Sequence, residues 1–199
     1  MSADEKIAAF VDLLLSRSPA AGLTAFRTRQ EVLRKGIGPS LLGEPLLPQG
    51  ATVLDVGSGG GIPALPLAIH RTDLQFILCE PSGAKASFLR EAVALLGLSA
   101  QVRCATVEEE LSRGGTYGAA TVRGVRLRRG LLKRLVKALG PEGPLLLWTG
   151  GDREALYAEW LRALGADVRR IEAPEAGIAL LAASVPRGTS TPVEGDTPG

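Results

Sequence analysis

The spacing of apolar residues changes once along the chain, near residue 50. In residues 3–17 they recur at intervals of three and four, which predicts an amphipathic helix followed by a turn at Ser18-Pro19. A second helix is expected over about 28–42, with a break where a Gly-Ile-Gly-Pro run interrupts it at 36–39. We therefore expect a helical extension over residues 1–45.

From residue 51 onward, short apolar runs alternate with helical patterns. The first run, 51–56, stops at glycines and is typical of a strand buried on both faces of a sheet. Further strands are expected at 75–80, 101–106, 117–125, 144–150, 166–173 and 177–184. The helices expected between them are 64–70, 87–98, 128–140 and 154–165. This alternation predicts an α/β fold with a doubly wound, mostly parallel, seven-stranded sheet over residues 46–185.

Composition limits the class of protein. A length of 199 residues fits one domain with a small appendage. Aromatic residues make up only 4%, which argues against a single-strand binder that relies on stacking many bases. Residues 186–199 hold one Val among polar residues, Gly and Pro, so we expect this tail to be disordered.

The sequence shows few features that would indicate a membrane span, a signal peptide or a metal site. The chain has no run of 18 apolar residues, and its N-terminal helix carries charges where a signal peptide would be apolar, so we expect a cytoplasmic protein without a membrane span. Cys79 and Cys104 are expected to be buried thiols. With two Cys and one His we expect no metal site, and His70 is expected at the surface or as a helix cap.

The positive charges are unevenly distributed. Eight of the 23 Lys and Arg residues lie between Glu110 and Glu142, and none of the 21 acidic residues lies between those two. A basic block on an otherwise acidic chain indicates an anionic partner. A solvated helix face would give the same pattern, so charge alone leaves both interpretations open.

A glycine-rich loop follows the first predicted strand and opens a helix. It reads Asp55-Val-Gly57-Ser-Gly59-Gly60-Gly61-Ile62-Pro63. Glycines let the backbone turn sharply and lie against a ligand, and the helix N-terminus adds free N–H groups. Ile62 stands where a nicotinamide or flavin fingerprint needs glycine, and the chain lacks the phosphate-loop pattern G-x-x-x-x-G-K-[ST].

The loop and the next strand together resemble the first motifs of class I S-adenosylmethionine-dependent methyltransferases, which have a Rossmann-like fold. An acid, Asp55, precedes the G-x-G-x-G run by two residues, and Glu80 ends the second strand. A carboxylate at that position can accept both ribose hydroxyls of a nucleoside. We therefore expect S-adenosyl-L-methionine as cofactor, although the glycines alone would also suit a plain tight turn.

Two further places are candidates for the same site. Methyltransferases commonly seat the adenine after the third strand, here Thr106-Val107-Glu108, although Glu108 and Glu109 would equally suit the first turn of a short helix. Arg123 lies near the end of the fourth strand, at the edge that lines the ligand crevice in open α/β sheets, or it is one more surface arginine of the basic block.

Five segments resemble the GidB/RsmG family of bacterial methyltransferases, which act on N7 of one guanine in 16S ribosomal RNA. They are G-L-T-A (22–25), D-V-G-S-G-G-G-I-P-A-L-P-L-A (55–68), F-L-R-E (88–91), V-E-E (107–109) and V-R-G-V (122–125). The resemblance runs from about Gly22 to Gly150. With the loop and the acid, it implies a cofactor-binding set of Asp55, Gly57, Ser58, Gly59, Gly61, Ile62, Glu80, Val107, Glu108 and Arg123.

The chain departs from the family pattern at polar positions that would face the substrate. Gly22 replaces Asn of N-L-T, and Val122 replaces Ser of S-R-A. Gly36 and Pro39 replace the His and Asp of H-x-x-D-S, and Thr149 replaces a Lys. These departures bear on which substrate the protein methylates more than on whether it transfers a methyl group.

The chemistry that the resemblance implies needs few protein groups. Methyl transfer from a sulfonium is an in-line displacement, and guanine N7 already exposes a lone pair, so we expect no general base. The expected partner is 16S rRNA or the small ribosomal subunit, bound by a monomer. The expected RNA-binding residues are Arg27, Arg34, Lys35, Arg126, Arg128, Arg129 and Lys133. Two alternatives stay open: a class I methyltransferase acting on a small molecule or protein, and a non-catalytic RNA-binding relative.

Overall fold

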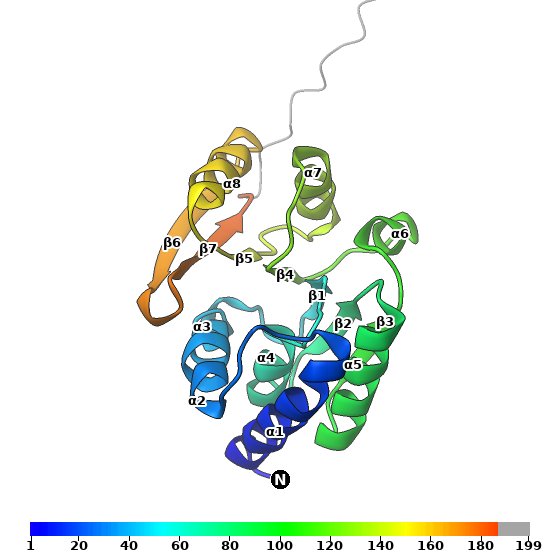
Figure 1. The fold of residues 1–199 in the computed structure, drawn as a ribbon. Coiled ribbons are helices and arrows are strands. Elements are labelled where there is room, and N and C mark those ends of the chain that lie inside the picture. Colours follow the sequence, from blue (N-terminus) through cyan, green and yellow to red (C-terminus); the bar gives the residue numbers. More distant parts are fainter. Residues whose placement is uncertain (187–199) are drawn as a thin grey trace, which may run out of the picture.

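The structure, a computed structural model, describes residues 1–186 and contains one seven-stranded sheet (Figure 1). The predicted disorder of the tail falls on residues that lie outside this range, apart from Pro186. The strands are β1 (Thr52–Val56), β2 (Gln75–Cys79), β3 (Ala100–Arg103), β4 (Ala119–Arg123), β5 (Leu145–Thr149), β6 (Asp167–Ala173) and β7 (Ile178–Ser184). Their order across the sheet is β3-β2-β1-β4-β5-β7-β6, and β7 alone among them runs antiparallel to its neighbours. The predicted α/β fold is confirmed.

Helices cover both faces of this sheet. They are α1 (Ala3–Ala21), α2 (Arg29–Glu31), α3 (Gly38–Leu41), α4 (Ala64–His70), α5 (Gly83–Leu96), α6 (Val107–Ser112), α7 (Arg129–Ala138) and α8 (Asp152–Ala163). Figure 1 shows α1 to α5 on one side of the sheet and α6 to α8 on the other. Each side has its own core: Phe10 and Leu65 belong to the first, Leu132 and Tyr157 to the second. The side chains of the N-terminal helix α1 are therefore part of the first core and pack against the sheet domain.

The strand order reverses at the centre of the sheet. The chain leaves β1 toward β2 on one side, and it later returns to β4 on the other side of β1. In open α/β sheets, such a reversal opens a crevice beyond the carboxyl ends of the two central strands. The glycine loop follows β1 and Arg123 ends β4, so both lie at this crevice.

The expected turn at Ser18-Pro19 is wrong, because α1 continues through Pro19 to Ala21. Proline in the last turn removes one backbone donor and leaves the rest of the helix intact. The helix ends at Gly22, whose N–H donates to the Ser18 carbonyl at 2.9 Å. The Ser18 hydroxyl also donates to the Thr24 carbonyl at 3.1 Å, and this contact fixes the direction of the following segment.

The expected break at 36–39 is also wrong, because the chain stays helical from Arg29 to Leu41. A π-helical segment, η1 (Val32–Ile37), joins α2 to α3. The wider turn accommodates Pro39, which cannot donate a hydrogen bond to the carbonyl of Lys35 four residues earlier. That carbonyl instead accepts from Arg123.

Smaller differences concern individual residues. The helix predicted at 87–98 begins four residues earlier, at Gly83, and the third strand ends at Arg103. Cys79 is buried as expected, but Cys104 is exposed because it follows the end of β3. His70 is the exposed last residue of α4. Within residues 1–186, the structure has no helix with the length and apolar character that crossing a bilayer requires.

Candidate active site

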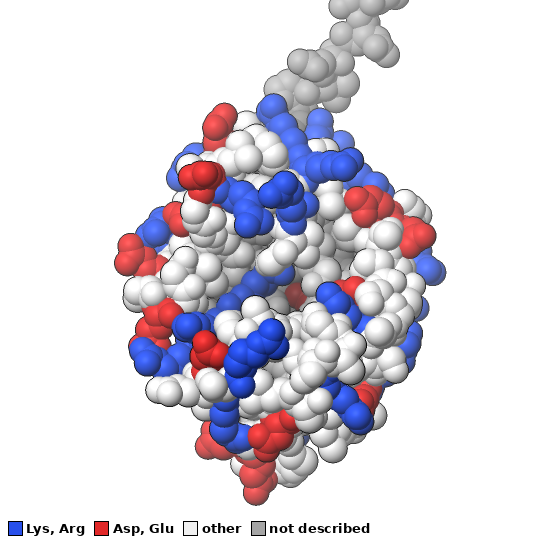
Figure 2. Space-filling view, viewed as in Figure 1, with Lys and Arg blue, Asp and Glu red and all other residues white. Residues whose placement is uncertain are grey.

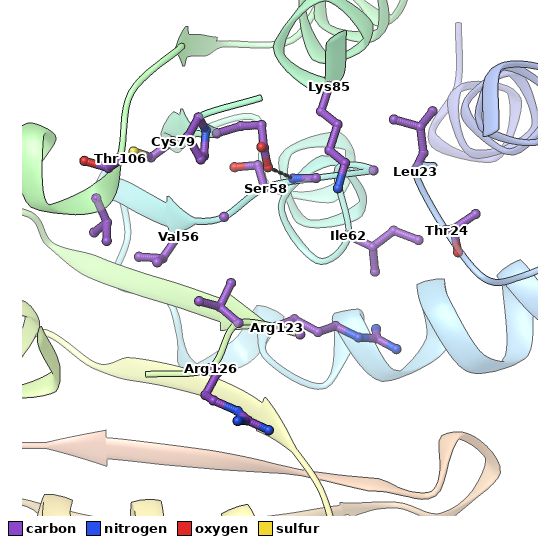
Figure 3. A pocket seen from close by; sticks show the side chains of 18 of the residues that line it. Leu23, Thr24, Val56, Ser58, Ile62, Cys79, Lys85, Thr106, Arg123 and Arg126 are labelled. Carbon is purple, nitrogen blue, oxygen red and sulfur yellow. Dashed lines mark hydrogen bonds between the residues drawn. The ribbon is translucent and has the colours of Figure 1, made fainter. Parts of the chain in front are cut away.

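A cavity of about 610 Å³ lies at the carboxyl ends of β1, β2 and β4. This volume is typical of a small-molecule site. In Figure 3 the cavity is seen with Thr106 and Cys79 at one end and Leu23 and Thr24 at the other, while Figure 2 shows a hollow in the surface. The crevice predicted from the strand order therefore holds a pocket.

The glycine loop is tied to β2 by its backbone. The N–H groups of Gly57 and Ser58 both donate to the carbonyl of Cys79, at 2.9 and 3.1 Å. Gly57 has a φ of +67°, and a Cβ added there would lie 2.5 Å from the side chain of Val125. At Gly59, an added Cβ would meet only the Gly57 carbonyl oxygen, at 3.7 Å. Gly57 thus lies against protein, whereas Gly59 leaves room in the pocket.

Glu80 presents a buried carboxylate in the middle of this cavity. Its side chain follows β2 and is 6% exposed. One oxygen accepts from the Gly59 N–H at 2.9 Å, the bond drawn in Figure 3, and the other accepts from the Ser82 N–H at 2.8 Å. Each carboxylate oxygen can accept more than one hydrogen bond. Glu80 is therefore held in a fixed direction with acceptor capacity left for ligand hydroxyls.

Asp55 lies behind the loop, outside the pocket lining. Its Oδ1 accepts from the Thr121 hydroxyl at 2.7 Å, and its Oδ2 has no hydrogen-bond partner among the described residues. Burial raises the pKa of Asp55 to about 6; the hydroxyls of Ser58 and Thr121 lower it and the charge of Glu80 raises it. Gly61 also lies behind the wall, since an added Cβ would come 2.4 Å from Leu65.

The segment after β3 serves as both a helix cap and a pocket wall. The Thr106 hydroxyl accepts from the Glu109 N–H at 3.2 Å, and the Glu109 carboxylate accepts from the Thr106 N–H at 2.7 Å. Glu109 is thus committed to capping α6. Val107 and Glu108 line the pocket instead. The two neighbouring acids therefore have different roles, because Glu108 faces the pocket and Glu109 caps the helix.

Arg123 reaches from the end of β4 to the π-helical segment η1. Its guanidinium donates to the carbonyls of Gly36, at 3.0 Å, and of Lys35. Burial lowers its pKa to about 10. It forms no ion pair with a described carboxylate, so its charge is balanced only by carbonyl dipoles. A cation in a pocket wall that lacks a carboxylate partner favours an anionic or electron-rich ligand.

Most of the predicted cofactor residues meet in this one cavity. The lining includes Gly57, Ser58, Gly59, Ile62, Glu80, Val107, Glu108 and Arg123. Sequence reasoning missed Lys85, which points into the cavity from the first turn of α5 (Figure 3), and Phe26. Lys85 could have been found from its place in the first turn of the helix that begins at Gly83, shortly after Glu80. Phe26 lies in a loop whose sequence has no motif that marks it as part of a site.

The predicted RNA-binding residues fall into three groups. Arg126 lines the cavity itself. Arg34 and Lys35 are exposed but engaged with Glu175, at 3.2 Å, and Glu31, at 3.6 Å. Arg27, Arg128, Arg129 and Lys133 are also exposed. Figure 2 shows Lys and Arg side chains on both sides of the hollow.

Four of the five positions that depart from the family pattern are buried in packed surroundings, whereas Gly22 is exposed where it ends α1. A Cβ on Gly36 would lie 3.0 Å from Ile62 and 3.2 Å from the Phe26 ring. The carbonyl of Pro39 accepts from the indole N–H of Trp148 at 2.7 Å. Val122 and Thr149 are both buried. None of these four residues is among the described residues that line the cavity, so they lie in the packing behind it.

The architecture is that of the class I methyltransferases. A precorrin-6Y C5,15-methyltransferase from Geobacter metallireducens aligns with a TM-score of 0.64 and 15% identity, over 83% of this chain and 92% of that one. A 16S rRNA N2 G1207 methyltransferase from T. thermophilus, solved with AdoMet and guanosine, aligns with a TM-score of 0.60 and 19% identity, over 81% of this chain and 44% of that one. At these identities the likeness establishes the fold.

The chain belongs to the GidB family, described as rRNA small subunit methyltransferase G, whose model matches residues 3–164. A ribosomal RNA small subunit methyltransferase G from Sorangium cellulosum is 36% identical over 186 residues, which are 88% of this chain and 78% of the relative. One from Mycobacterium leprae is 37% identical over 143 residues, which are 71% of this chain and 58% of the relative. The predicted family is confirmed.

Proposed function

We propose that the protein is an S-adenosylmethionine-dependent methyltransferase that methylates N7 of a guanine in 16S ribosomal RNA. The observation that carries this is the buried Glu80 carboxylate, held 2.9 Å from the Gly59 N–H in a pocket at the switch point of the sheet. Membership of a family described as rRNA small subunit methyltransferase G supports the substrate class.

The residues present fit the cofactor. Glu80 would accept the two ribose hydroxyls, with Gly57, Ser58 and Gly59 beside the sugar and the chain that leads to the sulfur. Val107 and Glu108 would hold the adenine at the α6 end of the pocket, and Ile62 would pack near the other end. Asp55 and Gly61 would support the loop from behind, since neither lines the pocket.

The bound cofactor would supply a methyl group already activated on a positively charged sulfur. The protein would hold this group and the guanine in line and exclude water. N7 carries an exposed lone pair, so the described pocket needs no side chain to remove a proton. Arg123 would line the acceptor side, where its position at the end of β4 lets it orient the substrate.

The basic residues would bind RNA phosphates around the hollow. We propose Arg27, Arg34, Lys35, Arg126, Arg128, Arg129 and Lys133 for this role, in a monomer that binds 16S rRNA or the small ribosomal subunit in the cytoplasm. Arg34 and Lys35 would first have to leave Glu175 and Glu31, so they would contribute less than the unpaired arginines of the α7 region.

The test has two arms. Calorimetry with S-adenosylmethionine and S-adenosylhomocysteine measures cofactor binding, and 16S rRNA from a strain lacking the gene is then incubated with protein and cofactor and mapped for N7-methylguanine. We expect binding and one new modified guanine. Cofactor binding without RNA methylation would favour a small-molecule or protein substrate, and RNA binding without cofactor binding would favour a non-catalytic relative.

A further inference from the structure

The end of the cavity opposite Val107 and Glu108 is built from the N-terminal segment. Leu23, Thr24 and Phe26 line it, together with Ile62 from the glycine loop. Figure 3 shows Leu23 and Thr24 across the cavity from Thr106. If the adenosine lies at the Thr106 end, as the proposed function requires, this second wall is left for the methyl-bearing end of the cofactor and for the acceptor.

Phe26 occupies a defined position in that wall. A Cβ built on Gly36 would lie 3.2 Å from the ring atom Cε2 and 3.0 Å from Cδ1 of Ile62. The ring and Ile62 thus fill the space in which any side chain at position 36 would begin.

The backbone around Phe26 is held in place by short polar contacts. The Phe26 N–H donates to the Thr24 hydroxyl at 3.1 Å. The Thr24 N–H donates to the Ser18 hydroxyl at 3.3 Å, and that hydroxyl donates to the Thr24 carbonyl at 3.1 Å. The backbone that carries the half-buried ring is therefore held by the end of α1.

We propose that Phe26 is the residue on which the target guanine stacks. Enzymes that modify a base take it out of the helix and hold its flat face against aromatic or apolar side chains. Among the residues lining this cavity, Phe26 is the aromatic one, and Ile62 beside it extends the apolar surface. This assignment rests on the proposed function and names the part of the pocket that receives the RNA base.

The test compares Phe26→Leu, which keeps an apolar side chain without the ring, with Phe26→Tyr, which keeps the ring. We expect Phe26→Leu to lower kcat/KM for methyl transfer to the small subunit by about 5- to 150-fold, the range for one stacked base. Phe26→Tyr should stay within a few-fold of the natural protein. Affinity for S-adenosylhomocysteine and the melting temperature should be the same in both variants.

Full activity in Phe26→Leu, or a loss of cofactor affinity as large as the loss of methyl transfer, would overturn the assignment. If the natural protein transfers no methyl group to RNA, the proposed function fails instead.

Discussion

The guanidinium of Arg123 donates a hydrogen bond of 3.0 Å to the carbonyl of Gly36, 87 residues earlier in the chain. The contact fastens the π-helical segment η1 to the end of β4. The Arg123 guanidinium has no carboxylate partner among the described residues, and burial lowers its pKa to about 10. Arg123 thus lines the pocket and also holds η1, whose Gly36 lies beside Phe26 of the pocket lining.

Arg123→Ala should lower the turnover of methyl transfer more than the affinity for RNA. The variant removes both the link to η1 and the positive charge at the acceptor side of the pocket. Arg123→Lys should recover little, because an ammonium lacks the planar fork that reaches two carbonyls. Single-turnover rates and filter-binding affinities would measure the two effects separately. An equal loss in both would assign Arg123 to the general RNA-binding surface.

Glu80→Ala should weaken S-adenosylhomocysteine binding by about 1.5–3 kcal/mol, the scale of hydrogen bonds to a charged acceptor. The carboxylate also accepts from Gly59 and Ser82, so the change frees two backbone donors of the loop. Glu80→Gln keeps one acceptor oxygen and should lose less. Glu91→Gln on the exposed surface of α5 is the control and should bind normally. Calorimetry would show an unchanged affinity in Glu80→Ala if another group holds the ribose.

Stability should depend on the ionisation of Asp55. Its pKa is about 6 in the folded protein and near 3.8 in the unfolded chain, so the folded state binds more protons between these values. Stability from this group is therefore lost as the pH rises from about 4 through about 6, by roughly 3 kcal/mol. Asp55→Asn should remove that part of the pH dependence and raise stability at pH 7.5. Urea unfolding at pH 5 and 7.5 measures it, and an identical pH dependence in the variant would contradict the assignment.

Gly57 and Gly59 should respond differently to substitution. Gly57→Ala places a methyl group 2.5 Å from Val125, at a backbone angle that costs other residues about 1–2 kcal/mol, so it should lower the melting temperature. Gly59→Ala carries a similar backbone cost, since the φ of Gly59 is +51°, but its methyl group would meet only a carbonyl oxygen at 3.7 Å. It should therefore lose less stability than Gly57→Ala and should reduce cofactor affinity by taking up space in the pocket. Thermal unfolding and calorimetry on both variants would test the distinction, and the reverse ranking would be contrary to the structure.

The parts of the fold that follow from local patterns were predictable. The alternation of buried strands and helices, the glycine loop and the acid after β2 are adjacent in sequence, and the structure places them as expected. The errors lie where distant residues decide the outcome. Pro39 breaks an isolated helix, but here the freed carbonyl of Lys35 is satisfied by Arg123 from β4. Phe26 was missed for the same reason, since its place beside Gly36 depends on how α1 ends.

Substitution of Arg126, Arg128 and Arg129 together by Ala should reduce the salt dependence of RNA binding. Phosphate contacts give a log–log slope of about −0.7 to −0.9 per phosphate neutralised, so losing three contacts should flatten the slope by about 2 to 3. All three side chains are exposed, and in the described structure none is paired with a carboxylate.

The matched control removes two basic residues from the opposite face of the sheet. Lys6→Ala with Arg90→Ala, on α1 and α5, should leave the slope unchanged, because this face lies across the sheet from α7 (Figure 1). Arg134 is kept in both variants, since it braces α6 by donating to the Glu108 carbonyl and the Ser112 hydroxyl, each at 3.1 Å. Cofactor affinity should be equal in the natural protein, in the control and in a variant with only Arg128→Ala and Arg129→Ala, because neither of these two arginines lines the cavity. An unchanged slope in the triple variant would mean that the basic block is a solvated helix face, and the acceptor would then have to be sought among small molecules or proteins.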